Sequence, residues 1–365
     1  MNKLIIRLFS VCMMFAVFAA NGNSQSVPQN VKIVVNEAQQ KVDVTIGGTL
    51  FTSYIYSVKG GVTQKDTLLD KPVLYPLKTS KGTSITRGYP FEQRPNPERN
   101  DHPHHVGLWF NFGDVNGLDF WNNSFAIPAA RKSTYGTIRH TGVVSVKDGP
   151  TEGVLTVAAN WVNSNELVLL KEETKFVFKG TADWRIIERT TKLTAQRDTV
   201  TFTDNKEGMI AIRMDRAFEE PSTAPAVFVD SHGVATRVEP NNEGVNGWYR
   251  NSEGQEKERG VWGNPAKWVS LSADKGGEKI TVAIIDHKNN WGHPARSHAR
   301  GYGLFATNNM GSKTLTSNKD EAASRPLFLK KLSPGESVTF KHLIVIKTNG
   351  FATDEELNLL FANFN

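Results

Sequence analysis

Short segments rich in β-branched and aromatic residues, separated by turns, run along most of this 365-residue chain. Such segments are typical of β-strands, and pairs such as Gly47-Gly48 and Gly60-Gly61 mark turns between them. The segments are 32–36, 42–46, 51–56, 142–146, 154–159, 174–178, 185–189, 200–202, 282–285 and 337–346. Many strands without an internal repeat or a break in composition favour one large antiparallel β-sandwich of two packed sheets.

Only the C-terminus has a convincing helical pattern. Thr353 and Glu356 have the spacing of a capping box, and Leu357, Leu360 and Phe361 form an apolar stripe. We therefore predict a single all-β domain over residues 31–365 that ends in a short helix. Two consecutive β domains, joined near residues 130–150, are the alternative.

The first twenty residues have the pattern of an export signal. Lys3 and Arg7 precede a short apolar stretch that ends in Ala19-Ala20, before polar residues begin. A membrane span needs about 20 apolar residues, and this stretch is shorter than that. The pattern predicts a signal peptide over residues 1–20, a flexible segment over 21–30, and a periplasmic or secreted protein without stable membrane insertion.

Cys12 is the only cysteine, and it would leave with the signal. A lipoprotein that keeps Cys12 is the alternative, although bulky Val11 precedes it. Without a thiol, any metal would have to bind His, Asp or Glu. The formal net charge of +6 is mild, and acidic and basic residues alternate. This distribution favours a solvated mixed surface over nucleic-acid binding.

Three of the nine histidines fall within four residues, in the motif of residues 101–105. The period of two in the following strand places His105, Trp109 and Asn111 on one face, and the apolar residues between them on the core face. Imidazole moves protons near neutral pH. We predict that His104 and His105 are acid/base or substrate-orienting groups, that Trp109 and Asn111 contact substrate, and that His102 shapes the loop.

A second strand-like segment, residues 207–215, places Glu207, Arg213 and Asp215 on one face. A charge pair on an exposed sheet would give the same pattern. On the functional interpretation, Glu207 or Asp215 is the catalytic carboxylate, and Arg213 holds an anionic or hydroxyl-rich group.

Residues 286–305 hold three more histidines between two strand-like segments. We predict that His293 and His298 close the site from this loop, with His293 catalytic. His298, Arg300 and Tyr302 are predicted to bind substrate.

Two further residues are candidate sugar contacts, since carboxylates bind hydroxyls and tryptophan stacks on the C–H faces of sugars. Asp114 lies in a stretch dense in Asp, Asn and Trp, where an ordinary turn explains it equally well. Trp248 lies in the glycine-rich segment 241–264, which we expect to be a long binding loop.

A metal centre is an alternative that names specific ligands. His102 and His104 have a His-x-His spacing, and with His293 or His298 they could bind copper, zinc or iron. However, Pro103 distorts the chain and no third ligand lies at a diagnostic spacing, so we predict no cofactor. The chain also lacks a Gly-x-Ser-x-Gly elbow, a P-loop and a dinucleotide fingerprint.

The motifs of residues 101–109, 113–121, 248–263 and 302–306 resemble the secreted bacterial "methane oxygenase PmoA-like" family. The resemblance spans most of residues 31–350. It implies no catalytic roles, because that family is essentially of unknown function. The architecture and residue types are also loosely similar to the β-supersandwich of galactose mutarotases, although a fold alone does not establish a function.

These observations favour an exported carbohydrate-active enzyme, a glycoside hydrolase, lyase or epimerase, that binds a carbohydrate in an open cleft. Two alternatives stay open. One is a non-catalytic glycan-binding protein that uses the same Trp and Asn side chains. The other is a His-ligated, metal-dependent oxidase or oxygenase.

Overall fold

The computed structural model describes residues 27–57, 69–92, 94, 98–229, 234–316 and 318–365. The predicted signal peptide, with Cys12, lies outside these residues. So does most of the predicted flexible segment.

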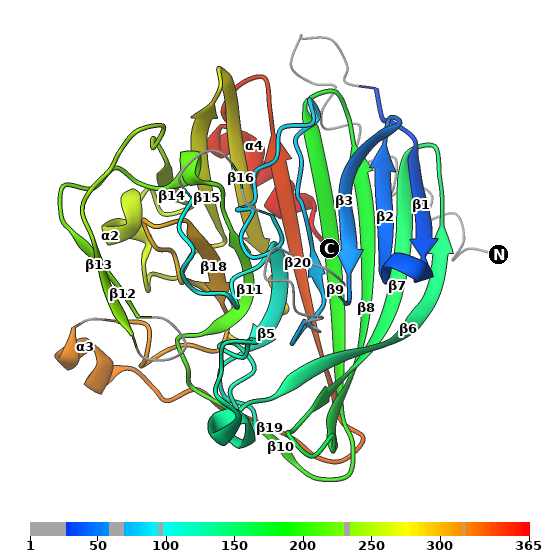
Figure 1. Cartoon of the computed structure of the whole chain (residues 1–365), viewed down its shortest axis with the longest axis vertical. Coiled ribbons are helices and arrows are strands. Elements are labelled where there is room, and N and C mark those ends of the chain that lie inside the picture. Colours follow the sequence, from blue (N-terminus) through cyan, green and yellow to red (C-terminus); the bar gives the residue numbers. More distant parts are fainter. Residues whose placement is uncertain (1–26, 58–68, 93, 95–97, 230–233, 317) are drawn as a thin grey trace.

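Two eight-stranded antiparallel sheets pack face to face (Figure 1). In spatial order, the first sheet contains β1 (Val31–Asn36), β2 (Lys41–Ile46), β3 (Thr49–Ile55), β4 (Val73–Leu74), β5 (Leu108–Phe112), β11 (Gly208–Arg213), β18 (Leu304–Asn308) and β17 (Arg296–Ser297). The second contains β14 (Trp248–Asn251), β15 (Trp268–Lys275), β16 (Glu278–Asp286), β20 (Ser337–Lys347), β9 (Trp184–Ala195), β8 (Val168–Gly180), β7 (Glu152–Val162) and β6 (Thr137–Lys147). The predicted all-β sandwich is confirmed.

Smaller elements decorate the sandwich. Two small two-stranded antiparallel sheets pair β10 (Val200–Thr203) with β19 (Leu329–Leu332) and β12 (Ala226–Val229) with β13 (Ala235–Val238). The short helices are α2 (Lys257–Val261) and α3 (Lys319–Ser324), and the 3₁₀ turns are η2 (Glu37–Gln39), η3 (Ala129–Thr134) and η4 (Arg216–Phe218). The expectation of one long loop over 241–264 was wrong, because β14 and α2 form within it. No helix within the described ranges is long and apolar enough to cross a membrane.

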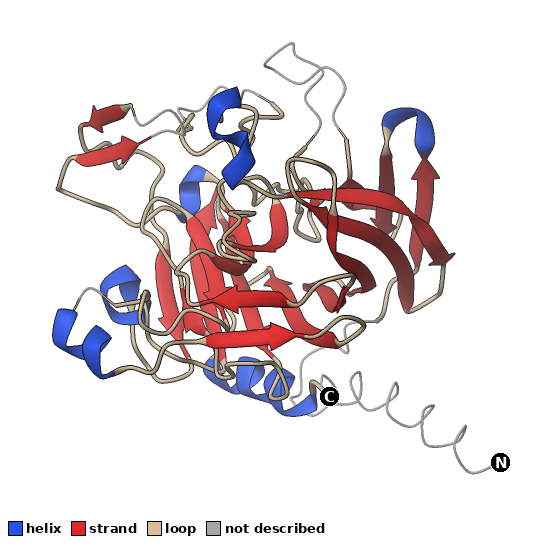
Figure 2. Cartoon of the chain, turned by 90° about the horizontal axis from the view of Figure 1, so that it is seen from below, coloured by secondary structure: helices blue, strands red, loops and turns tan. Residues whose placement is uncertain are grey.

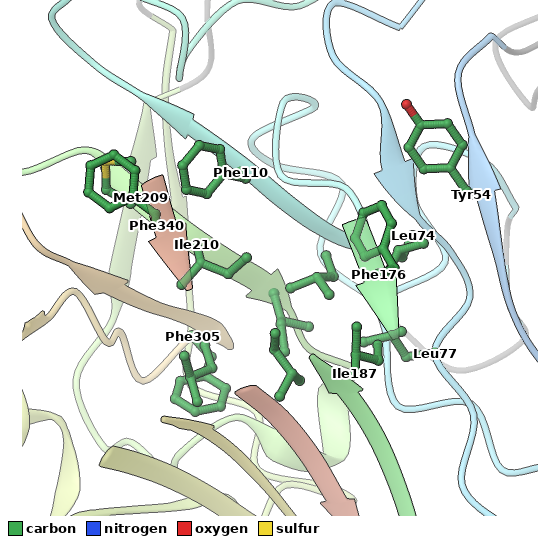
Figure 3. Packing of buried hydrophobic residues seen from close by; sticks show 14 of the residues in the cluster. Tyr54, Leu74, Leu77, Phe110, Phe176, Ile187, Met209, Ile210, Phe305 and Phe340 are labelled. Atoms are coloured by element: carbon green, nitrogen blue, oxygen red, sulfur yellow. The ribbon is translucent and has the colours of Figure 1, made fainter. Parts of the chain in front are cut away.

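The main core fills the space between the sheets. Phe110 and Ile210 from the first sheet meet Phe176, Ile187 and Phe340 from the second (Figure 3). Each is at most 2 % exposed. The alternation predicted for β5 is observed, since Leu108, Phe110 and Phe112 all point into this core.

The outer face of each sheet is also covered. On the second sheet, α4 (Asp354–Asn363) packs Leu357 and Leu360 against Trp184 and Trp268. The predicted C-terminal helix and its capping box are therefore confirmed: Thr353 Oγ1 accepts from the Glu356 amide at 3.2 Å, and the Glu356 carboxylate accepts from the Thr353 amide at 2.9 Å.

On the first sheet, loop segments and the short 3₁₀ turn η3 lie over the outer face, where no helix in the described part of the chain packs as α4 does (Figure 2). Trp109 and Ala211, which point away from the main core, pack with Tyr75, Val106 and Trp121 in a separate apolar cluster. Both faces of β5 are therefore buried, and every residue of the strand is inaccessible. The loop-covered face of β5 and β11 carries the candidate site described next.

Docking of α4 depends on the apolar stripe that the sequence predicts. Leu357 is 1 % exposed, whereas Leu359 on the same helix is 43 % exposed. We expect Leu357→Ala to lower the free energy of unfolding by about 3 kcal/mol, since it leaves a cavity against the second sheet. Leu359→Ala should change it by less than about 0.5 kcal/mol. Urea unfolding followed by tryptophan fluorescence measures both, and equal losses would contradict this packing.

Candidate active site

A cavity of about 470 Å³ opens over β5, β11 and β18 on the loop-covered face of the first sheet. Four segments that are distant in sequence form its walls: residues 102–105, 119–135, 206–207 and 298–304. The lining residues are His102, His104, His105, Asp119, Trp121, Asn122, Ile127, Arg131, Tyr135, Lys206, Glu207, His298, Arg300, Tyr302 and Leu304. The structure therefore brings together His104, His105, Glu207, His298, Arg300 and Tyr302 from the predicted set.

Four aromatic rings form a continuous stack along one wall. Tyr302 lies on His102, His102 on His105, and His105 on Trp109, with centroid separations of 5.4, 4.8 and 5.4 Å and interplanar angles of 7°, 3° and 18°. This is offset stacking, which fixes the planes of the imidazoles. The expectation that His102 only shapes the loop was incomplete, since its ring lines the cavity within this stack. Trp109 lies beneath the wall and is fully buried.

A buried guanidinium holds this stack from behind. Arg213, the last residue of β11, is 1 % exposed, and its guanidinium carbon lies 4.8 Å from the centroid of the Tyr302 ring. One Nη donates to Asp101 Oδ1 at 2.8 Å, and the other lies 3.3 Å from His105 Nδ1. Arg213 does not line the cavity. It supports the cavity wall, in contrast to the substrate contact that the sequence predicts.

This contact determines which nitrogen of His105 carries the proton. A guanidinium can only donate hydrogen bonds, so His105 Nδ1 must accept, and neutral His105 then carries its proton on Nε2. Burial, with the neighbouring His104, His102 and Arg213, holds the pKa of His105 well below its ordinary value of 6.5. At neutral pH, His105 therefore offers the cavity a neutral N–H donor.

His104 lies edge-on to His105, with ring centroids 4.3 Å apart. Its peptide oxygen accepts from buried Lys71 Nζ at 2.7 Å, which pins the loop. Burial and the nearby Lys71 charge keep the pKa of His104 well below 6.5, so this ring is also neutral. Its Nδ1 has no hydrogen-bond partner among the described residues.

In another part of the cavity lining, an anion lies beside the histidine where Arg213, a cation, lies beside His105. Glu207 Oε2 lies 3.5 Å from His298 Nδ1, and Lys206 pairs with the other carboxylate oxygen. Burial lowers the pKa of His298 to about 4 although Glu207 opposes the shift. The pKa of Glu207 is also lowered: burial would raise it, but His298 and Lys206 outweigh that effect. At neutral pH, the pair is a carboxylate beside a neutral imidazole. At 3.5 Å the two groups form no hydrogen bond, but the nearby carboxylate favours the tautomer with the proton on Nδ1 and an acceptor at Nε2.

Trp121 links the two walls. Its ring centroid lies 5.9 Å from that of His105 and 5.9 Å from that of His298. The donor His105 and the acceptor His298 thus flank the same indole within one cavity.

Several lining residues were missed by the sequence analysis. Asp119 accepts three bonds, from the Trp121 amide at 2.9 Å, the Asn122 amide at 2.9 Å and Asn122 Nδ2 at 2.7 Å. Asp119 belongs to the stretch rich in Asp, Asn and Trp in which the sequence predicts Asp114 as the sugar contact. Arg131 and Tyr135, in and after η3, carry no motif that could have found them.

Three predicted contacts from the strands and turns around β5 have structural roles instead. Asp114 Oδ1 accepts from the Gly117 amide at 3.0 Å, as in an ordinary turn. Asn111 is buried, and its Nδ2 donates to the Phe120 carbonyl at 2.6 Å. Trp248 lies on β14 at the edge of the second sheet and is 37 % exposed. None of the three lines the cavity.

Two predicted catalytic residues also lie elsewhere. Asp215 follows β11, where strand alternation no longer applies, and pairs with Arg94 at 3.1 Å and Lys275 at 2.6 Å. His293 Nδ1 contacts Asp286 Oδ2 at 2.6 Å, and its ring stacks on Phe361 of α4. Neither residue lines the cavity that contains His105, and each is paired with groups that also lie outside its lining.

A metal centre has no preformed ligand set within the described ranges. No group of three or more His, Cys, Asp or Glu side chains there has an arrangement that could hold a metal ion. Metal dependence stays a prediction, which elemental analysis of protein purified without chelator can test.

Residues 41–362 match the family of unknown function DUF6807. The chain belongs to this family. The match does not carry the PmoA-like name, so that resemblance stays a prediction. No curated protein matches this DUF6807 member.

Three solved structures illustrate what this DUF6807 member is similar to. A GH36 α-galactosidase of Geobacillus stearothermophilus is 13 % identical, with a TM-score of 0.38, over 87 % of this chain and 41 % of the enzyme. The heparan sulfate lyase HepC of Pedobacter heparinus is 10 % identical, with a TM-score of 0.34, over 95 % and 42 %. A galactose mutarotase-like protein of Clostridium acetobutylicum is 12 % identical, with a TM-score of 0.34, over 89 % and 99 %. The chain spans about two fifths of the length of the α-galactosidases that it matches.

The Glu207–His298 pair can be tested by NMR titration. We expect His298 to titrate near pH 4. Glu207→Gln should move its pKa lower still, because removing the anion takes away the charge that favours the imidazolium. The matched control is Glu166→Gln, which breaks an exposed ion pair with Arg139 and should leave His298 unchanged. A His298 pKa near 6.5 that is insensitive to Glu207→Gln would contradict this arrangement.

Proposed function

We propose that this protein is an exported carbohydrate-active enzyme that removes a proton from a sugar carbon, as lyases and epimerases do. The observation that carries the proposal is the opposite polarity of two neutral histidines in one cavity. His298 is oriented by a carboxylate and offers an acceptor nitrogen, whereas His105 is oriented by a guanidinium and offers a donor.

His298 would be the general base. Its Nε2 accepts the proton, and Glu207 stabilises the imidazolium that forms, because a carboxylate beside Nδ1 favours the charged ring. Burial keeps His298 unprotonated near neutral pH, which is the state that a base requires. The 3.5 Å separation is longer than a good hydrogen bond, and such contacts commonly shorten when substrate binds.

His105 would stabilise the negative charge that develops on a substrate oxygen as the proton leaves. A neutral N–H held in a fixed orientation is well suited to this role, since it needs no reorganisation during the reaction. Because Nδ1 accepts from Arg213, the ring cannot take up the substrate's proton at Nε2 without first losing its own. Of the two roles predicted for His105, acid/base or substrate-orienting, this proposal therefore takes the orienting one.

A glycoside hydrolase would need a protonated carboxyl to donate to the leaving oxygen. Glu207 and Asp119 are two carboxylates in one cavity, and burial raises the pKa of Asp119. Three N–H groups donate to Asp119, but burial and the nearby Glu207 charge outweigh them, so the pKa of Asp119 stays above its usual value. Hydrolysis with Asp119 as the acid is therefore the second candidate, and the opposite partners of His105 and His298 are the reason for proposing proton abstraction by His298.

The decisive measurement is exchange of a substrate carbon-bound proton with solvent. The purified protein is incubated in deuterated water with oligosaccharides of defined composition, and the products are examined by NMR and mass spectrometry. We expect deuterium at a sugar carbon after epimerisation, or an unsaturated product after elimination. Reducing-end release without either would identify a hydrolase, and stable binding with no chemistry would identify a glycan-binding protein.

Two histidine variants separate this site from the one that the sequence predicts. His298→Gln should lower kcat at least about 100-fold, because the base is lost. His293→Gln keeps a donor for Asp286 and should retain nearly full activity, since His293 lies outside the cavity. Circular dichroism checks that both variants fold. Loss of activity in His293→Gln alone would overturn this assignment.

The donor role of His105 has its own matched pair. His105→Gln can still present an N–H group, whereas His105→Phe retains the ring stack but presents none. We expect His105→Phe to lower kcat about 100-fold and His105→Gln to lower it less, with smaller changes in KM. Steady-state kinetics measure both, and an unchanged kcat in His105→Phe would exclude the donor role.

A further inference from the structure

We infer that the sugar bound in this cavity is a uronate, and that Arg131 binds its carboxylate. The inference rests on the proposed function, because it names the substrate class of the same site. It is carried by the charged groups that line the cavity and by the partners that each of them already has.

Three cations line the cavity, and two are already paired. Arg300 lies 3.2 Å from Glu258 Oε1, and Lys206 pairs with Glu207. Arg131 is different, because no carboxylate among the described residues lies within ion-pair distance of it. One of its Nη groups donates to Tyr135 Oη at 2.8 Å, and the guanidinium lies 5.8 Å from the centroid of the Tyr135 ring.

The Tyr135 contact positions Arg131 without neutralising it. Tyr135 is buried and both residues line the cavity, whereas Arg131 is exposed at its edge. Among the described residues, the guanidinium donates only to Tyr135 Oη. A planar guanidinium can bind a carboxylate through two parallel hydrogen bonds, which fixes orientation as well as charge. An anionic group on the ligand would pair with Arg131, the cation of the cavity that has no carboxylate partner among the described residues.

The neutral groups of the cavity also favour a ligand rich in acceptors. His105 contributes a neutral N–H at Nε2. The oxygens of Asp119 already accept from three N–H groups. The carboxylate of a uronate would supply charged acceptors for the His105 N–H and the Arg131 guanidinium, whereas a neutral hexose offers only hydroxyls.

The proposed chemistry needs the same substituent. In a uronate, the C5 proton lies next to the carboxylate, and a cation that neutralises this carboxylate makes the proton easier to remove. His298 would take the C5 proton, and the electron pair would delocalise into the carboxylate. In epimerisation, water delivers a proton to C5 on the opposite face. In elimination, the C4–O bond breaks, a C4–C5 double bond forms, and the leaving oxygen takes a proton from water. In both routes, the hydroxide that remains takes the proton from the His298 imidazolium and restores the neutral base. Neither route needs an oxidant or a reductant.

Binding can be tested independently of turnover. Isothermal titration compares D-galacturonate, D-glucuronate and D-mannuronate, as methyl glycosides, with the corresponding methyl hexosides and with methyl galactoside 6-sulfate. We expect at least one uronate to bind about tenfold more tightly than its neutral counterpart, as a charge-assisted pair would produce. Arg131→Gln should reduce this ratio to about one without weakening the neutral sugar. Arg139→Gln removes a half-exposed arginine outside the cavity and should leave the ratio unchanged.

The outcomes distinguish the substrate class from the reaction. An Arg131-dependent preference for a uronate without deuterium exchange supports the inference and contradicts the proposed reaction. Exchange on a neutral sugar supports the reaction and overturns the inference. Equal binding of acidic and neutral sugars, no uronate binding at all, or a preference for the 6-sulfate over every uronate would each overturn it. So would a uronate preference that Arg131→Gln leaves intact.

Discussion

The site depends on one buried carboxylate. Asp101 lies 2.7 Å from Arg87, 2.8 Å from Arg213 and 3.0 Å from His102 Nδ1. Burial alone would raise the pKa of Asp101, but Arg213, His102 and Arg87 hold it well below its usual range. Burying charges is costly unless each is paired and hydrogen-bonded. Here, Arg87 also donates to the carbonyls of Arg99, Asp101, His102 and His105, so the same ion cluster fixes the backbone of the histidine loop.

This anchoring explains how a loop can hold the histidine side chains in fixed positions, as a strand would. Arg213 extends from β11, and its contacts with Asp101, His105 and Tyr302 tie the histidine loop and the segment before β18 to one rigid element. On the other side of the sheet, Ile210 and Ile212 hold β11 in the main core. Removing the Asp101 charge would leave two buried arginines without their shared partner. The His105 and Tyr302 rings, which Arg213 contacts, would then lose the group that fixes their orientation.

The sequence predicted what repeats locally and missed what depends on distant pairing. Period-two alternation placed Phe110 in the core, and the capping box placed α4 correctly. Strand alternation also predicted His105 and Arg213 in one site, because both residues lie within or close to regular strands. It failed for Asp215, which lies beyond the end of β11, and for His293, whose partner Asp286 belongs to the other sheet. Asp119, Arg131 and Tyr135 come from irregular segments, whose positions depend on the sheet that they cover.

Burial shifts the pKa values of His104, His105 and His298 in the same direction, so burial alone cannot assign their roles. It lowers the pKa of His104, His105 and His298 alike and leaves each ring neutral. The partner at Nδ1 makes the difference. A guanidinium forces His105 to accept there and to donate from Nε2, whereas a carboxylate lets His298 donate there and accept at Nε2. Two residues of one type in one cavity thus acquire opposite hydrogen-bonding polarity from the groups beside their Nδ1 atoms.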